Sequence, residues 1–218
     1  MTLGTAAGES LRLDAVRIAL PGRELIRSLS IEIAPGEVVT VMGPSGSGKS
    51  SLLSFIGGQL HAPFTAEGEV SVGAQRLDGL PPHARGAGIL FQDDLLFPHL
   101  SVAGNLLFGL PTSVKGRHRR LAAIDGALEE CGLAGYGKRD PSTLSGGQRA
   151  RVALMRTLLA SPRMLLLDEP FGKLDASLRD DFRRFVFSHA LERGLPTLLV
   201  THDADDARAA GARVLTLA

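Results

Sequence analysis

The segment Gly43–Ser50, which reads GPSGSGKS, constrains the fold of this chain more than any other feature of its sequence. It follows the β-branched run Val38–Met42, which is typical of a strand buried on both faces. It precedes a helical pattern that we place at Ser50–Gln59. A glycine-rich turn between a buried strand and a helix is the context of a phosphate-binding loop. We therefore expect an α/β core organised around this turn.

Each residue type in this phosphate-binding loop suits contact with an anion. Glycines lack Cβ atoms, so backbone N–H groups can converge on a phosphate, and the positive end of the following helix reinforces them. Lys49 is expected to reach the β- and γ-phosphates, and the Ser50 hydroxyl to bind Mg²⁺. The predicted nucleotide contacts are Gly43, Pro44, Ser45, Gly46, Ser47, Gly48, Lys49, Ser50 and Ser51. The alternative is a flexible glycine-rich turn without a ligand.

Apolar runs and helical patterns alternate along the rest of the chain, which predicts a mostly parallel sheet with helices on both faces. Alternating apolar residues between Leu11 and Ile33 predict an antiparallel β edge at the start. The segment from about 93 to 160 contains helical patterns and no clear strand, so we expect an inserted helical subdomain there. Residues 1–10 are expected to be a flexible lead to a single domain at 11–218. Further strands are predicted at 88–91, 164–167, 197–200 and 214–217, and further helices at 117–131, 148–159 and 175–193.

Two adjacent acids end one of the predicted buried strands, in the run Met164–Glu169. The carboxyl end of a parallel strand opens into the crevice where α/β folds bind ligands. Asp168 is the predicted Mg²⁺ ligand, because a hard cation favours carboxylate oxygen. Glu169 is the predicted general base, or the group that positions water, for attack on the γ-phosphate. The alternative is a solvated strand end.

Composition excludes several other classes. The formal net charge is +1, from 24 Lys and Arg against 23 Asp and Glu, so no overall field favours nucleic acid. No apolar run approaches the ~18 residues that span a bilayer, and the first ten residues lack an export signal. Cys131, the single cysteine, is expected to be a small apolar residue near a helix end rather than a catalytic thiol. We expect a globular protein of a reducing compartment, neither exported nor membrane-spanning.

A second glycine-rich element, Leu144–Gln148 (LSGGQ), again precedes a helical pattern. Its N–H groups could contact phosphate as the first loop does. One nucleotide does not need two such loops in one chain. The second loop is therefore expected either to fold onto the first or to serve a nucleotide held by another subunit.

In their order and spacing, these motifs resemble the ATP-binding subunit of ABC transporters, over nearly the whole chain from about Leu11 to Leu217. The signature loop Leu144–Gln148, 20 positions before Met164, separates this family from other P-loop proteins. The resemblance is carried by the phosphate-binding loop, Gln92, Leu144–Gln148, Leu166–Pro170, Leu174–Asp175 and His202 in Val200–Asp203.

The resemblance implies a role for each matched residue. Gln92 would contact Mg²⁺ and the attacking water, His202 the γ-phosphate, and Asp175 the interface between subunits. ATP bound to the opposite subunit of a head-to-tail homodimer would be covered by Ser145, Gly146, Gly147 and Gln148. The implied catalytic residues are Lys49, Gln92, Glu169 and His202, and the implied metal contacts are Ser50, Gln92 and Asp168. The alternatives are a strand-end polar residue at 92, a surface histidine at 202 and a helix N-cap at 175.

The resemblance also implies an ATP hydrolase that uses ATP and Mg²⁺ and is peripheral to the cytoplasmic face of the cell membrane. Its expected partners are integral membrane permease subunits, with a substrate-binding protein as a further candidate and no nucleic acid. The segment Gln92–Val102 is similar to a loop of bacterial importers, and the sixteen residues after His202 resemble the short importer form, so import of a small solute is expected. The alternatives are a soluble ABC-type ATPase of DNA repair or translation, and a small-molecule P-loop kinase.

Two positions depart from the family pattern. Members usually place an aromatic residue before the first hairpin to stack on adenine, whereas Leu20 stands at that position here. The usual Ser-Ala-Leu-Asp is replaced by Gly172–Asp175, which leaves Lys173 at the expected interface. Base recognition is therefore expected to be weak, with Leu20 as the base contact.

Overall fold

The computed structural model describes residues 8–211 and 213–217, and these residues divide into two compact units. The first unit contains the residues up to 89, residues 163–169 and those from 187 onward, and the second contains residues 90–162 and 170–186. Residues 1–7 of the predicted flexible segment lie outside the described residues. None of the helices in the described ranges is long and apolar enough to cross a membrane.

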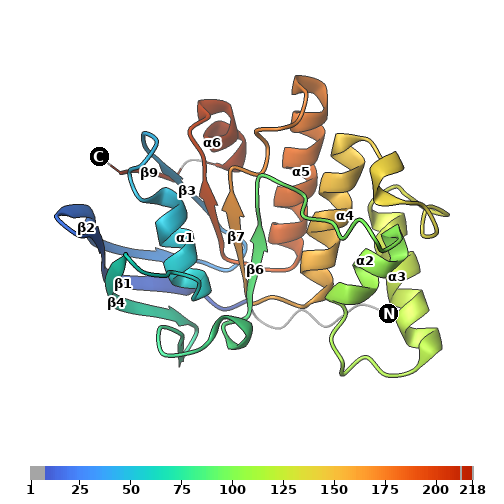
Figure 1. The fold of residues 1–218 in the computed structure, drawn as a ribbon, viewed down its shortest axis with the longest axis horizontal. Coiled ribbons are helices and arrows are strands. Elements are labelled where there is room, and N and C mark those ends of the chain that lie inside the picture. The colour runs from blue at the N-terminus through green and yellow to red at the C-terminus, as the bar shows by residue number, and fades with distance from the viewer. Residues whose placement is uncertain (1–7, 212, 218) are drawn as a thin grey trace. The chain divides into compact units, whose positions relative to one another are not determined.

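The first unit contains two sheets (Figure 1). One has five strands in the order β6-β7-β8-β3-β9, with parallel pairing of β7 to β8, β8 to β3 and β3 to β9. The other is antiparallel, in the order β2-β1-β4-β5. The strands are β1 (Leu11–Leu20), β2 (Arg23–Ile33), β3 (Val38–Met42), β4 (Thr65–Val72), β5 (Gln75–Arg76), β6 (Ala87–Leu90), β7 (Met164–Asp168), β8 (Thr197–Val200) and β9 (Val214–Thr216).

Helices complete an α/β fold, so the predicted fold class is confirmed, with the antiparallel strands forming a sheet of their own. The helical part of the second unit lies between β6 and β7 in sequence and consists of α2, α3 and α4. The helices are α1 (Lys49–Gly57), α2 (Val102–Gly109), α3 (Arg117–Glu130), α4 (Gly146–Leu159), α5 (Ala176–Glu192) and α6 (Ala204–Ala210), with short 3₁₀ turns at Pro82–Ala84 and Pro141–Thr143.

The burial pattern explains the two kinds of strand. All four residues of β8 are buried, as expected for a parallel strand covered on both faces. In β1, buried and exposed residues alternate, but the register shifts between Leu13 and Val16. Leu52, Leu53 and Ile56 of α1 share one hydrophobic cluster with residues of both sheets, so α1 packs between them (Figure 1).

Four elements were not predicted from the sequence: β4, β5, α2 and α6. β4 contains Gly68 with φ +104°, and a Cβ there would lie 2.7 Å from the Cα of Val16, at the irregularity of β1. This close approach requires glycine, a residue that weakens a strand pattern. The predicted start of α4 at Gln148 is two residues late, because Ser145 is the N-cap and the helix begins at Gly146.

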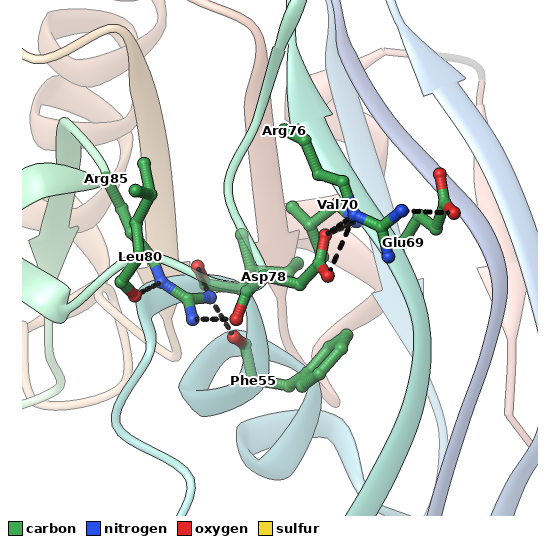
Figure 2. Close-up of polar contacts among 8 residues, drawn as sticks. Phe55, Glu69, Val70, Arg76, Asp78, Leu80 and Arg85 are labelled. Atoms are coloured by element: carbon green, nitrogen blue, oxygen red, sulfur yellow. Dashed lines mark hydrogen bonds and ion pairs between the residues drawn. The ribbon is translucent and has the colours of Figure 1, made fainter.

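A buried arginine joins the carboxyl end of α1 to the chain that leads into β6 (Figure 2). Arg85 is 6% exposed, and its guanidinium donates to four backbone carbonyls, those of Phe55, Ile56, Asp78 and Leu80, at 2.8–3.0 Å. Burial lowers the pKa of Arg85. The last carbonyls of a helix have no partner within it and carry partial negative charge, so a cation at this end stabilises α1.

Figure 2 also shows how the residues before Arg85 are fixed. Arg76 donates from Nε to Asp78 at 2.9 Å, and this hydrogen bond lowers the pKa of the Asp78 carboxyl. The same carboxylate accepts from the backbone N–H of Val70 at 3.3 Å. Asp78 is thus held by β4 and β5 while its own carbonyl faces Arg85.

The substitution Arg85→Met tests this arrangement. It keeps most of the side-chain volume but removes the side-chain donor of four carbonyls, of which that of Phe55 keeps a further partner, the N–H of Gly58. The free energy of unfolding should therefore fall by about 3 kcal/mol. Urea denaturation measures the change. Arg12→Met, which removes an ion pair with Glu32 in which both side chains are more than half exposed, is the control and should cost about 0.5 kcal/mol or less. Equal losses in the two variants would contradict the role of Arg85.

Candidate functional site

The phosphate-binding loop has the backbone that its glycines predict. Gly46 and Gly48 have φ of +80° and +95°, in the left-handed region that other residues rarely adopt. A Cβ at Gly43 would lie 2.7 Å from Ser47 Oγ and 2.8 Å from the carbonyl oxygen of Leu217. The Ser47 hydroxyl is buried and has no hydrogen-bond partner among the described residues. The loop therefore has a conformation that needs glycine and contains one buried side-chain group without a partner in the described part of the chain, the Ser47 hydroxyl.

Lys49 is the cation of this loop. Its side chain is 6% exposed, and Nζ donates to the carbonyl oxygens of Gly43 at 2.8 Å and Pro44 at 2.9 Å. The ammonium is thus held against the loop by neutral acceptors. An anionic phosphate is a stronger acceptor for an ammonium than a carbonyl group, so the arrangement is suited to exchange these bonds for phosphate contacts.

The two residues predicted to bind Mg²⁺ lie together, although 118 positions separate them. Ser50 Oγ donates to Asp168 Oδ1 at 3.1 Å. Burial raises the pKa of Asp168, and the charge of Glu169 adds to this, whereas the hydrogen bond from Ser50 and the charge of Lys49 lower it. A hydroxyl beside a partly buried carboxylate fits a hard cation that takes its other oxygens from phosphate. The described residues contain no group of three or more His, Cys, Asp and Glu side chains that could hold a metal alone.

Glu169 and His202 form the second pair. The distance from His202 Nδ1 to Glu169 Oε1 is 3.1 Å, and the histidine side chain is 66% exposed whereas the carboxylate is 27% exposed. Glu169 has φ +47°, and its N–H donates to the carbonyl of Val200 at 2.9 Å. A non-glycine residue in this conformation is strained. The backbone thus holds this carboxylate in a costly position at the end of β7.

The hairpin that carries Leu20 touches the phosphate-binding loop. Leu20 is half-buried and pairs with Arg23 across the turn. Arg23 Nη2 donates to the carbonyl of Gly46 at 3.2 Å, and a Cβ at Gly48 would lie 3.1 Å from Leu25 Cβ. Sequence reasoning missed Arg23 and Leu25, because no motif marks them. The contact brings the Leu20 hairpin to the predicted nucleotide loop.

In the second unit, the signature loop begins α4. Ser145 Oγ accepts from the N–H of Gln148 at 3.3 Å, and Gln148 Oε1 accepts from the N–H of Ser145 at 2.9 Å, which is a capping box. Gly146 and Gly147 form the first turn of α4, where N–H groups lack partners within the helix. Cys131 is buried at the carboxyl end of α3, as predicted for a small apolar residue near a helix end, and burial raises the pKa of its thiol to about 12.

Gln92 is exposed, and the two residues after Asp93 are tied to α4. Arg149 donates to Asp94 Oδ2 at 3.1 Å and to the carbonyl of Leu144 at 2.8 Å. Arg156 donates to the carbonyls of Asp94 at 3.2 Å and Leu95 at 2.8 Å. Leu95 has φ +47°, so these bonds hold a strained backbone. Sequence reasoning missed both arginines, because charged residues on a helix usually face solvent.

Lys173, which departs from the family pattern, has a partner within the second unit. Its ammonium pairs with the carboxylate of Asp93, next to Gln92. Asp175 is exposed and immediately precedes α5, where its carbonyl accepts from the N–H of Arg179 at 2.8 Å. The structure therefore groups Gln92, the signature loop and Asp175 in one unit, and the phosphate-binding loop, Asp168, Glu169 and His202 in the other.

The known proteins to which this chain is similar belong to the family that its motifs resemble. A family model described as ABC transporter matches residues 26–172. The chain is 51% identical over 191 residues to the "Uncharacterized ABC transporter ATP-binding protein YnjD" of Escherichia coli (strain K12), and the match covers 88% of each chain.

Two further relatives are named as import ATP-binding proteins. The chain is 42% identical over 210 residues to the thiamine import ATP-binding protein ThiQ of Mesorhizobium japonicum, covering 96% of this chain and 81% of that protein. It is 41% identical over 207 residues to the Fe(3+) ions import ATP-binding protein FbpC of Streptomyces avermitilis, covering 95% of this chain and 59% of that protein. The chain thus spans about three fifths of the length of the FbpC relative.

The raised pKa of Asp168 predicts a stability effect with a definite sign. A folded-state pKa above the unfolded value means that the charged carboxylate is disfavoured in the folded protein, so stability falls as the pH rises through that window. Asp168→Asn should therefore raise the Tm of the ligand-free protein at pH 7, by about 2–4 °C if the gain is about 1 kcal/mol. Thermal unfolding followed by circular dichroism measures this.

The gain should vanish below about pH 4, where the carboxylate is protonated in both states. Ser51→Ala, a half-buried hydroxyl of α1 that does not ionise, is the control and should show no such pH dependence. A loss of Tm in Asp168→Asn at pH 7 would show that the carboxylate stabilises the ligand-free fold.

Proposed function

The chain belongs to the ABC transporter family, and on that premise we propose that it is the ATP-hydrolysing subunit of a transporter that imports a small solute. Membership makes it an ATP-binding ATPase, and Mg²⁺ is typical of the family. Residues 11–218 would act as one ATPase domain, with a helical subdomain at about 93–160. The observation that best supports the ATP-hydrolysing part of this proposal is the 3.1 Å hydrogen bond from Ser50 to Asp168, the two residues proposed to hold Mg²⁺.

The residues of the first unit support hydrolysis by positioning and charge. The N–H groups of the phosphate-binding loop would bind the β- and γ-phosphates, and Lys49 Nζ would exchange its two carbonyl contacts for phosphate oxygens. Glu169 would accept the proton of the attacking water, and His202, 3.1 Å from it, would contact the γ-phosphate and orient the carboxylate. Phosphoryl transfer needs little covalent help from the protein.

Ser50 and Asp168 would hold Mg²⁺, with Gln92 as a further contact. When bound, the cation supplies positive charge to the β- and γ-phosphate oxygens. Leu20 would contact the base by apolar packing, with Leu25 and Arg23 beside the loop.

The second glycine-rich loop supports a head-to-tail homodimer in the ATP-bound state. Ser145 and Gln148 use each other's N–H groups in the capping box, which leaves the N–H groups of Gly146 and Gly147 available to an anion. We propose that Ser145, Gly146, Gly147 and Gln148 cover ATP bound to the partner subunit, with Asp175 at the interface. One nucleotide does not need two such loops in one chain, which favours use of the second loop by the partner subunit.

The printed names of the relatives support transport. Several are import ATP-binding proteins, for thiamine, Fe(3+), sulfate or taurine. We propose integral permease subunits as partners, a substrate-binding protein as a further one, and a peripheral position at the cytoplasmic face of the membrane. The soluble alternative in DNA repair or translation would need a coiled-coil insertion or two tandem ATPase units. The sequence has one phosphate-binding loop, and α2, α3 and α4 have 8, 14 and 14 residues.

The substitution Glu169→Gln tests the catalytic proposal. Removing the carboxylate that accepts the proton should lower the rate of ATP hydrolysis by at least about 100-fold, while the phosphate contacts and ATP affinity remain. Phosphate release and equilibrium binding of ATP measure the two quantities, and dimer should accumulate with ATP. Hydrolysis within a few-fold of the unmodified rate would show that Glu169 has another role.

Lys49→Ala is the matched comparison, because it should lose binding and hydrolysis together. The variant removes the principal cation that faces the terminal phosphates. If both variants bound ATP equally well, Lys49 would not be a phosphate contact.

Mixing two inactive variants tests the proposed dimer. Lys49→Ala combined with Ser145→Arg should form one composite site that lacks both groups and one intact site, so part of the ATPase activity should return. Ser145→Arg adds bulk and charge to the loop that faces the partner's nucleotide. A mixture that stays inactive although heterodimers are demonstrated would argue either for use of the signature loop within its own subunit or for obligatory cooperation between the two sites.

A further inference from the structure

Positive charge is concentrated at the start of α3. Lys115, Arg117, His118, Arg119 and Arg120 lie within six residues, although the whole chain has a net charge of +1. We call residues 115–120 the basic segment. The sequence has no acidic residue between positions 94 and 125. All these basic side chains are exposed except that of Arg120, which is half-buried and donates to the carbonyl of Val114 at 3.1 Å.

These positive charges do not stabilise α3. The N-terminus of a helix is the positive end of its dipole, so cations in the first turn are unfavourable there. Gly116 is the N-cap residue and provides no side-chain cap, and the first turn contains no acid. Within the described residues, no ion pair involves Lys115, Arg117 or Arg119. Departures from local stability of this kind are expected where a surface binds a partner.

Exposed apolar side chains flank the basic segment. Phe108, in the last turn of α2, is 68% exposed, and Leu121, in the second turn of α3, is 47% exposed. α2 and α3 contact each other, and Figure 1 shows the connection between them as an extended loop. Ile124, Ala127 and Leu128 are the buried residues of α3, so Leu121 is not needed to form its packed face.

We propose that the basic segment, with Phe108 and Leu121, binds the surface of an anionic lipid bilayer. The negative potential of such a surface attracts each Lys or Arg, by roughly five-fold in affinity per residue. Exposed apolar side chains beside these cations enter the headgroup region, which is the combination used by interfacial segments. This inference goes beyond the proposed function and does not depend on it, because lipid binding needs neither ATP nor a permease.

Co-sedimentation with vesicles tests the proposal, using phosphatidylcholine vesicles with and without phosphatidylglycerol. The full chain should bind the anionic vesicles at low salt, lose this binding as salt increases, and leave neutral vesicles unbound. The double variant Arg117→Glu, Arg119→Glu should bind at least about 25-fold more weakly. Phe108→Ser should bind about ten-fold more weakly, because it removes the apolar contact.

The control is Arg17→Glu, Arg27→Glu, which makes the same change of net charge on exposed residues of β1 and β2. It should bind anionic vesicles within about three-fold of the unmodified chain. The Arg117→Glu, Arg119→Glu variant should also have an equal or higher Tm, since acids favour the first turn of a helix, so weaker binding cannot be ascribed to unfolding. ATP hydrolysis without vesicles should be the same in all variants.

Three results would overturn the proposal. The first is no binding of the unmodified chain to anionic vesicles at low salt. The second is an equal loss of binding in the control pair, which would assign the effect to overall charge. The third is binding to a DNA duplex that depends on Arg117 and Arg119 without binding to vesicles, which would assign the segment to nucleic acid. A failure of ATP hydrolysis would leave these outcomes unchanged and would count against the proposed function alone.

Discussion

A turn of six residues, Gly43–Gly48, joins β3 to α1, and the rest of the first unit depends on the conformation of this turn. The turn requires left-handed backbone at Gly46 and Gly48, and it requires space at Gly43 against Ser47 and Leu217. Such a conformation persists only where its surroundings fix it. β3 does so by pairing with β8 and β9, and α1 does so by packing between the two sheets.

The polar groups at the two ends of α1 have different partners, and both arrangements follow from the helix dipole. At the N-terminal end, the free N–H groups and Lys49 are available to an anion. At the C-terminal end, Arg85 satisfies the carbonyls of Phe55 and Ile56. The carbonyl end of the helix is therefore neutralised inside the protein, whereas the positive end belongs to the loop that we propose binds phosphate.

The sequence predicted the elements whose residues act locally. The phosphate-binding loop, β7 and the signature loop are contiguous stretches with their own chemistry, so their positions on strands and helices could be inferred. The positions of β4 and α6 could not be inferred from the sequence. Gly68 weakens the strand pattern of β4, and the segment Ala204–Ala210 is too short to show a strong periodic pattern.

Contacts between residues far apart in the chain could not be predicted from the sequence either. In each case a flexible arginine side chain contacts a backbone carbonyl or a carboxylate far away in the sequence. The contacts are those of Arg23 with Gly46, of Arg85 with α1, and of Arg149 and Arg156 with the segment after Gln92. An arginine has no sequence pattern that distinguishes such a role from an exposed position. The predicted pairing of Ser50 with Asp168 was possible because each residue belongs to a recognisable motif.

The left-handed backbone of Glu169 has a consequence for how this protein can change by mutation. Glycine adopts φ +47° without strain, so a glycine at this position would relax the fold while removing the carboxylate. Selection for folding alone would therefore favour loss of the acid. Under the catalytic role that we propose for Glu169, activity and stability conflict at this position: a descendant with glycine here would be more stable but would lack the proton acceptor.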